Sequence, residues 1–219
     1  MFKRKILSKL EAWKQDERHK PLILRGARQV GKTTVVNEFG SQFDNYLYFN
    51  LEMSESVRLF EMDIPLNDLV NMLFASLGKS QKKGSTLIFI DEIQNSPKTI
   101  ALLRYFYEQR PDLYVIAAGS LLENLVDVNV SFPVGRVMYL ALRPCSFYEF
   151  LGAIGKNNLL TILSQKAEYS IAFHEQLMHQ FNQYTIIGGM PEAVQHYAET
   201  QDIIAIEDVY ETLVQAYKD

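Results

Sequence analysis

A run of eight residues combines two glycines, a lysine and a hydroxyl residue at the fixed spacing G-x-x-x-x-G-K-[ST]. The run reads Gly26, Ala27, Arg28, Gln29, Val30, Gly31, Lys32 and Thr33, and Thr34 follows it. The glycines allow backbone N–H groups to turn inward around phosphate oxygens without a clash from a Cβ atom. Lys32 is expected to reach the β- and γ-phosphates, and the Thr33 hydroxyl to bind Mg²⁺. The pattern predicts a site for a nucleoside triphosphate.

The flanking residues supply the elements that such a loop needs. Leu22 to Leu24 form a short apolar stretch after Pro21, and the residues from Thr33 to Phe39 are typical of a helix that ends at Gly40. A helix that begins directly after the loop adds the partial positive charge of its N-terminus to the phosphate site. The order strand, glycine loop, helix therefore supports the phosphate-binding interpretation.

A second polar pair follows a buried strand. Thr86 to Ile90 is an apolar run of the kind found in strands covered on both faces, and Asp91 and Glu92 come directly after it. Ligands of open α/β sheets bind at this carboxyl edge. We expect Asp91 to hold Mg²⁺ through its water shell and Glu92 to orient and deprotonate an attacking water. The alternative is a strand that ends in a charged turn.

Two further polar residues follow predicted strands. Ser120 ends the run from Leu113 and could contact the γ-phosphate or the attacking water, or cap a helix at 121–123. Arg136 is expected to begin a fifth strand that runs to Leu142. An arginine there could act as a finger on the phosphates, in cis or from a neighbouring subunit, which would imply a homo-oligomer. A structural ion pair is the alternative role.

Strand-like and helical runs alternate up to about residue 146, which predicts an α/β fold with a parallel sheet covered on both faces. Beyond residue 147 the strand-like runs end and helical spacing takes over. We expect an ATPase core with an N-terminal helix at 1–146 and a helical lid at 147–219. The last helix reaches the end of the sequence without a cap, so a further C-terminal domain is expected beyond it.

Composition limits the classes of function. The 219 residues are 47% apolar and carry a net charge of −4, and the only cysteine is Cys145. We expect no direct nucleic-acid contact by this segment, no membrane span, and a reducing, cytoplasmic location. His174 and His179 are five residues apart, so on a helix they face different ways, unlike the pair of a zinc protease. No N-K-x-D sequence is present, which favours ATP over GTP.

Five motifs together resemble a known family. They are the phosphate loop, F-I-D-E-I-Q at 89–94, A-A-G-S at 117–120, G-R at 135–136 and L-R-P-C-S-F-Y-E-F-L at 142–151. The chain resembles the prokaryotic AAA+-type P-loop ATPases related to the archaeal ATPase and origin-recognition-like clade. The resemblance implies a sheet of strand order 5-1-4-3-2 and a lid, in part similar to a winged helix. It also makes Pro191, in G-G-M-P-E-A-V at 188–194, a candidate adenine contact or a residue of a plain interhelical loop.

Two functions fit these expectations. The first is Mg²⁺-dependent ATP hydrolysis that drives movement of the lid and of a C-terminal domain. The second is an interaction module in which bound ATP or ADP sets the arrangement of the domains with little turnover. Both need Lys32, Thr33 and Asp91, and they differ in whether Glu92 activates a water.

Overall fold

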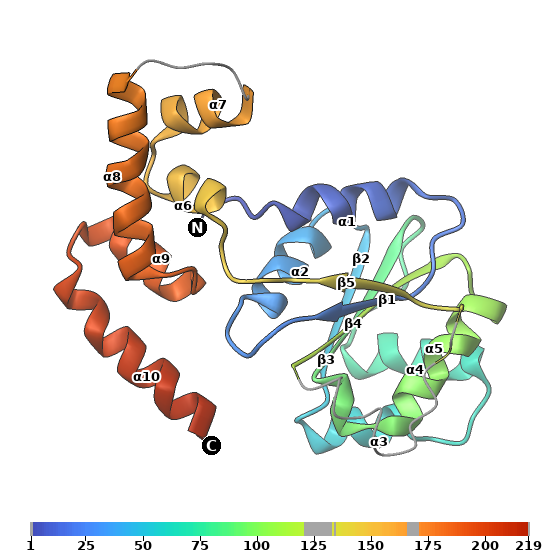
Figure 1. The fold of residues 1–219 in the computed structure, drawn as a ribbon. Helices are drawn as coiled ribbons and strands as arrows, with labels where there is room; N and C mark the ends of the chain where they lie inside the picture. Colours follow the sequence, from blue (N-terminus) through green and yellow to red (C-terminus); the bar gives the residue numbers. More distant parts are fainter. Residues whose placement is uncertain (1, 121–132, 134, 166–170, 219) are drawn as a thin grey trace. The chain divides into compact units, whose positions relative to one another are not determined.

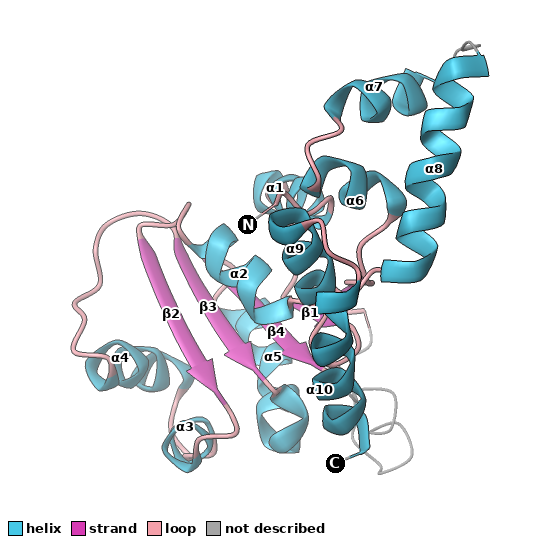
Figure 2. Cartoon of the chain, turned by 90° about the vertical axis from the view of Figure 1, so that its left-hand side faces the viewer, coloured by secondary structure: helices cyan, strands magenta, loops and turns pink. Residues whose placement is uncertain are grey.

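The computed structural model describes residues 2–120, 133, 135–165 and 171–218. Its strands are β1 (Leu22–Arg25), β2 (Asn45–Asn50), β3 (Thr86–Asp91), β4 (Leu113–Gly119) and β5 (Met138–Ala141). They form one sheet in the order β2-β3-β4-β1-β5, and every neighbouring pair is parallel (Figures 1 and 2). Read from the other edge, this is the predicted order 5-1-4-3-2. The α/β fold and its strand order are confirmed.

Ten α-helices and two short 3₁₀ turns accompany the sheet in the described residues. The helices are α1 (Ile6–Gln15), α2 (Lys32–Gly40), α3 (Ser54–Phe60), α4 (Leu66–Ser76), α5 (Pro97–Gln109), α6 (Phe147–Ala153), α7 (Asn157–Gln165), α8 (Ile171–Ile187), α9 (Pro191–Thr200) and α10 (Glu207–Lys218); the 3₁₀ turns are η1 (Ile93–Asn95) and η3 (Ile204–Ile206). The chain divides into two compact units. One holds residues 8–27 and 32–142, and the other holds 1–7, 28–31 and 143–219. They are called the sheet unit and the helical unit below.

The sheet unit has a helical layer on each face of its sheet. One face packs against α3, α4 and α5 through a core that includes Leu47, Ile88 and Val115. Helices α1 and α2 lie on the opposite face (Figure 1). There, aromatic contacts join Trp13 of α1 to Phe39 of α2 and to Tyr114 of β4. All six residues of β3 are buried. Apolar cover on both faces explains the continuous apolar run that marks this strand in the sequence.

Local signals fix most element boundaries in the sheet unit. Ser96 caps α5, since its side chain accepts a hydrogen bond from the Thr99 N–H, and Pro97 takes the first helical position. Gly78 has a φ of +62° just after α4, a conformation that glycine adopts without strain. The expected N-terminal helix is α1, which begins at Ile6.

One boundary prediction was wrong at a candidate site residue. Arg136 does not begin a strand, because β5 starts only at Met138. The Arg136 N–H donates to the Pro133 carbonyl in a turn, and Gly135 beside it has a φ of +76°. Pairing with β1 begins only at Met138, which lies opposite Leu22.

The helical unit has its own core. Buried side chains of α6, α8 and α9, among them Phe150, Ile187 and Tyr197, pack together. Ser146 and Glu149 form a reciprocal capping box at the start of α6. The turn before α9 lies against the segment before α6, where the Cys145 N–H donates to the Gly189 carbonyl at 2.6 Å. A Cβ atom on Gly189 would lie 2.5 Å from the Cys145 oxygen, so this position requires glycine.

Candidate functional site

The phosphate loop adopts the conformation that its glycines predict. It joins β1 to α2, and Gly31 has a φ of +87° immediately before the helix. A residue with a side chain at position 31 would be strained in that region. Gln29, at the tip, also has a positive φ of 61°. Ala27, Arg28 and Gln29 are exposed, and Thr34 is exposed on the first turn of α2.

Lys32 lies buried at the start of α2. Its side chain is folded back on the loop, where Nζ donates to the carbonyl oxygens of Gly26 at 3.0 Å and Ala27 at 2.9 Å. Only 6% of the residue is exposed. A buried ammonium group needs compensating acceptors, and the loop carbonyls supply them. Phosphate oxygens accept hydrogen bonds from an ammonium group more strongly than carbonyl oxygens do. Lys32 could therefore exchange its two carbonyl partners for a phosphate.

Thr33 and Asp91 meet at the carboxyl edge of the sheet. The Thr33 hydroxyl donates to Asp91 Oδ2 at 2.6 Å, although 58 residues separate the two in sequence. The Glu92 N–H donates to the other carboxylate oxygen at 3.1 Å. Parallel pairing of β3 with β4, and of β4 with β1, places the end of β3 close to the loop that leaves β1. The structure therefore brings together two oxygen donors that the sequence predicted for one metal ion.

The environment of Asp91 fits a hard cation. Burial raises the pKa of Asp91 above its ordinary value, and the hydrogen bond from Thr33 opposes that rise. A buried carboxylate with one hydroxyl neighbour gains from a positive charge nearby, and Mg²⁺ accepts carboxylate, hydroxyl, water and phosphate oxygens. The described residues contain no cluster of three or more His, Cys, Asp or Glu that could hold a metal ion alone. A nucleotide site needs no such cluster, since phosphates supply further ligands.

Glu92 is half-buried beside this pair. Its backbone is left-handed, with φ 52° and ψ 45°, and it leads directly into η1. Gln94 Nε2 donates to Glu92 Oε2 at 2.5 Å. This hydrogen bond fixes one carboxylate oxygen of Glu92 beside Gln94, and the role of Glu92 in activating a water stays a prediction.

Ser120 and Arg136 belong to the sheet unit and have different surroundings. Ser120 follows β4 and is half-buried, and the helix predicted for 121–123 lies outside the described residues. Arg136 Nε donates to Glu108 Oε1 of α5 at 2.6 Å, and 41% of the arginine side chain is exposed. The same glutamate accepts a hydrogen bond from Arg104. The ion-pair role weighed for Arg136 is therefore present, and its role as an arginine finger stays a prediction.

The tip of the phosphate loop packs within the helical unit. The Val30 carbonyl accepts a hydrogen bond from Arg4 Nη1 at 3.0 Å. A Cβ atom on Gly31 would lie 3.7 Å from Arg4 Nη1 and 3.9 Å from Pro191 Cγ. Pro191 is the first residue of α9 and is half-buried. Its position beside Gly31 is compatible with a contact to a bound nucleotide, and its role as an adenine contact stays a prediction.

Three polar residues near the loop or the acid strand were not identified from the sequence. Arg4 is 6% exposed and donates to Glu149 Oε1, to the Val30 carbonyl and to the Arg143 carbonyl. Arg25 ends β1, and its guanidinium lies 4.1 Å from the centre of the Tyr139 ring. Gln94 follows the acid pair. Of these, only Gln94 carried a signal, as the last residue of F-I-D-E-I-Q.

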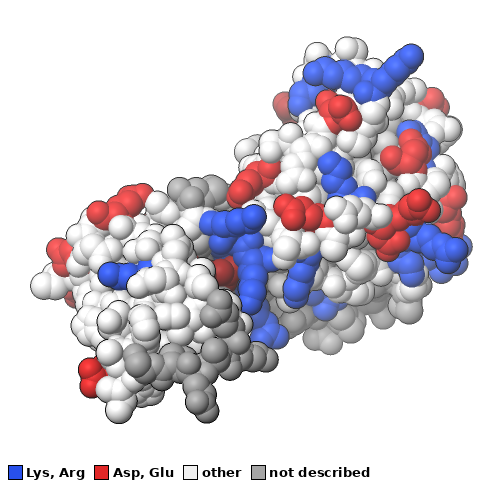
Figure 3. All heavy atoms as spheres, turned by 90° about the horizontal axis from the view of Figure 1, so that it is seen from above, with Lys and Arg blue, Asp and Glu red and all other residues white. Residues whose placement is uncertain are grey.

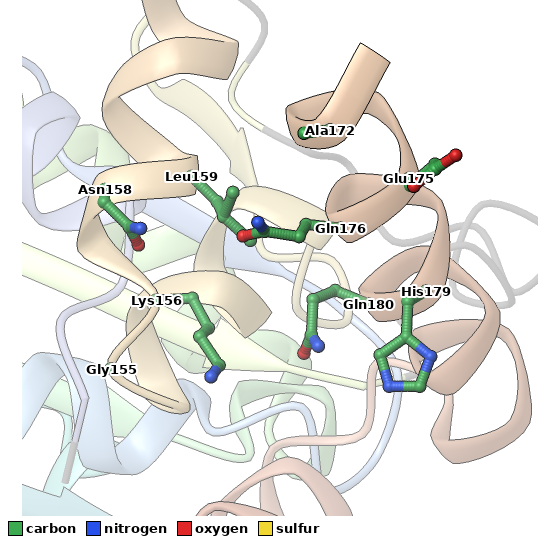
Figure 4. Close-up of a pocket in the computed structure, with 9 residues that line it drawn as sticks. All are labelled: Gly155, Lys156, Asn158, Leu159, Ala172, Glu175, Gln176, His179 and Gln180. Atoms are coloured by element: carbon green, nitrogen blue, oxygen red, sulfur yellow. The ribbon is translucent and has the colours of Figure 1, made fainter. Parts of the chain in front are cut away.

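A separate hollow lies within the helical unit. Its volume is about 620 Å³, and it is lined by Gly155, Lys156, Asn158, Leu159, Ala172, Glu175, Gln176, His179 and Gln180 (Figure 4). None of the predicted site residues contributes to it. Lys156, Gln176 and Gln180 point toward the space, whereas Glu175 points away. The hollow is open and has polar and apolar surface in similar amounts, unlike the enclosed apolar pockets that usually hold small ligands.

Surface charge is mixed on the face that Figure 3 shows. Lysine and arginine side chains lie among aspartates and glutamates and also gather at one place. The absence of direct nucleic-acid contact therefore stays a prediction. Among the described residues, no helix is both long and apolar enough to cross a bilayer.

The sequence matches a family model described as "AAA domain" over residues 18–151, which is more than half of the chain. The chain belongs to the AAA domain family. The match covers the phosphate loop, the acid strand, Ser120 and Arg136, and it ends inside α6. Together with the sheet order, it makes the chain an AAA+ P-loop ATPase of the nucleotide-binding class. No curated protein matches the sequence at a significant level.

Two solved structures align with this chain, and the first of them supports the fold. "Structure of Drosophila ORC bound to DNA" aligns with a TM-score of 0.51 and 16% identity over 87% of this chain and 58% of that chain. "Structure of C. elegans PCH-2" aligns with a TM-score of 0.48 and 12% identity over 91% of this chain and 63% of that chain. The chain thus spans about three fifths of the length of these two chains. At this level of identity the likeness to ORC concerns the fold.

Proposed function

We propose that this AAA+ domain binds ATP with Mg²⁺ and hydrolyses it, and that the energy of the cycle changes the arrangement of the protein. The observation that carries the proposal is the junction at the carboxyl edge of the sheet. There, Thr33 donates to Asp91, Lys32 lies in the loop, and the Glu92 carboxylate is held next to Asp91. An acid pair at the end of β3 beside a phosphate loop has the parts needed for phosphoryl transfer to water.

Each residue has a distinct task in this mechanism. Backbone N–H groups of the loop and Lys32 bind the β- and γ-phosphates, and Thr33 and Asp91 hold the cation. Bound there, Mg²⁺ would neutralise charge on the phosphates. Glu92 orients a water and takes one of its protons as the water oxygen attacks the γ-phosphorus. The bond from that phosphorus to the bridging oxygen breaks, which leaves ADP and inorganic phosphate.

The experiment compares Glu92→Gln with the full-length wild type. The variant keeps the size of the side chain and removes its basicity, so Mg-ATP affinity should stay within a few-fold. Turnover should fall by roughly the 10²–10⁴ that a general base contributes. Calorimetric titration of Mg-ATP and a steady-state phosphate-release assay measure the two quantities.

The same experiment decides for or against the second function. A nucleotide-gated module would copurify with slowly exchanging ATP or ADP, and wild type and Glu92→Gln would then release phosphate at the same low rate. That result would place Glu92 outside the chemistry and reject hydrolysis as the main function.

A further inference from the structure

The amide nitrogen and the amide oxygen of the Gln94 side chain have different surroundings. Its amide nitrogen donates to Glu92 Oε2 at 2.5 Å. Its amide oxygen is buried and, within the described part of the chain, has no hydrogen-bond partner. Buried polar atoms are nearly always paired, so an unpaired one calls for a reason. A leucine would fill the same volume without that cost, so packing alone does not explain a glutamine here.

The orientation of the amide depends on the carboxylate. If the Gln94 amide were reversed, its oxygen would face Glu92 Oε2, and two acceptors would meet without a proton between them. The ionised glutamate therefore selects the orientation in which nitrogen faces it. The unpaired oxygen of Gln94 is a consequence of this contact.

The backbone around Glu92 is also held. Its N–H donates to Asp91 Oδ1, and its carbonyl accepts from the Asn95 N–H at 3.1 Å. A left-handed backbone conformation is uncommon at a residue other than glycine, and the cases that do occur are concentrated at functional sites. It turns the chain so that the side chains at 92 and 94 meet, two residues apart. In an extended strand, the side chains at 92 and 94 would also lie on one face, but no turn would bring them together.

From this geometry we propose that Gln94 is a positioning residue: its amide holds the Glu92 carboxylate in the orientation from which it deprotonates water. The inference rests on the proposed function, because it assigns Gln94 a part in hydrolysis. Gln94 acts through Glu92 and makes no contribution to nucleotide binding.

The test is a double-mutant cycle of Gln94→Leu and Glu92→Gln in the full-length protein. Gln94→Leu should lower kcat by about 10- to 100-fold, a part of what a general base contributes, while calorimetric Mg-ATP affinity stays within a few-fold. In the Glu92→Gln background, adding Gln94→Leu should lower kcat no further, because residues that act as one unit are not additive. Asn95→Ala is the matched control: it keeps the N–H that donates to the Glu92 carbonyl and removes a side chain of the same 3₁₀ turn that donates to the Leu51 carbonyl, so it should keep near wild-type kcat.

Three outcomes would overturn the inference. They are wild-type kcat in Gln94→Leu, a further fall of kcat in the double variant, and an equal loss in Asn95→Ala. The last would show that the turn as a whole, and not the amide, matters. The proposed function fails separately, when Glu92→Gln alone turns over ATP at the wild-type rate.

Discussion

The sheet unit and the helical unit bury their apolar side chains to different degrees. Leu87 to Ile90 of β3 are 0% exposed, whereas Ile171 and Ile204 of the helical unit are 79% and 80% exposed. In a strand that is covered on both faces, as β3 is, polar residues are confined to the ends, so those that follow β3 stand out in the sequence. In the helical unit, polar and apolar residues mix along every helix. The difference teaches that motifs indicate chemistry most clearly where burial is most complete.

The first prediction concerns nucleotide binding. Lys32→Ala should abolish the thermal stabilisation that Mg-ATP gives, which is about 2.7 kcal/mol when ATP is at 100 times its Kd. Differential scanning fluorimetry with and without Mg-ATP measures it. Lys20→Ala is the matched control, because Lys20 Nζ also donates to a glycine carbonyl, that of Gly135, but lies outside the loop. An unchanged ATP shift in Lys32→Ala would reject the phosphate site.

The second expected effect tests the contrast in burial. Ile88→Ala in β3 should lower the free energy of unfolding by about 2–5 kcal/mol, because it leaves a cavity in a closed core. Ile204→Ala in η3 should change it by less than about 0.5 kcal/mol, as for other exposed positions. Urea unfolding followed by circular dichroism measures both. An equal loss in Ile204→Ala would mean that this side chain is covered in solution.

The third expected effect is smaller and concerns a charged contact of the helical unit. Burial tends to raise the pKa of Glu149, but hydrogen bonds from the Ser146 and Lys5 N–H groups and from Arg4 outweigh it, so the pKa is lowered. A carboxyl with a lowered folded-state pKa stabilises the fold above about 4.5, its ordinary value, and this is lost as the pH falls through the folded-state pKa. Cys145 and Tyr184 are the other titratable groups that interact with it.

Glu149→Gln should therefore cost about 1–3 kcal/mol at pH 7, and less as the pH falls below 4.5. Melting temperatures of wild type and variant across pH 3–7 provide the measurement. Glu175→Gln, on the exposed surface of α8, is the control and should show no such convergence. Parallel curves for Glu149→Gln and wild type would contradict the expected role of the carboxylate.

The sequence was sufficient to predict the sheet order and the meeting of Thr33 with Asp91. The sheet order was predicted through the resemblance to a known family, whereas the meeting of Thr33 with Asp91 follows from the glycine loop and the edge at which the strands end. It was not sufficient for Arg4, whose partner Glu149 lies 145 residues away. No local pattern indicates that contact, because it depends on how the helical unit folds.

Two local features were missed for other reasons. Helix α3 has seven residues, too few for a clear apolar period, and its N-terminus at Met53 has no side-chain cap. The turn at Gly135 delays β5, and a run of β-prone residues from Arg136 gave no sign of it. The contact of Gln94 with Glu92 depends on a positive φ at a glutamate, which propensities do not predict.

The close approach of Gly189 to Cys145 bears on how relatives of this chain diverge. Since the backbone of Gly189 lies against the backbone of Cys145, this glycine is needed for the stability of the helical unit and not for catalysis. A descendant that lost its phosphate loop would remain under selection to keep this glycine, provided that it kept the helices.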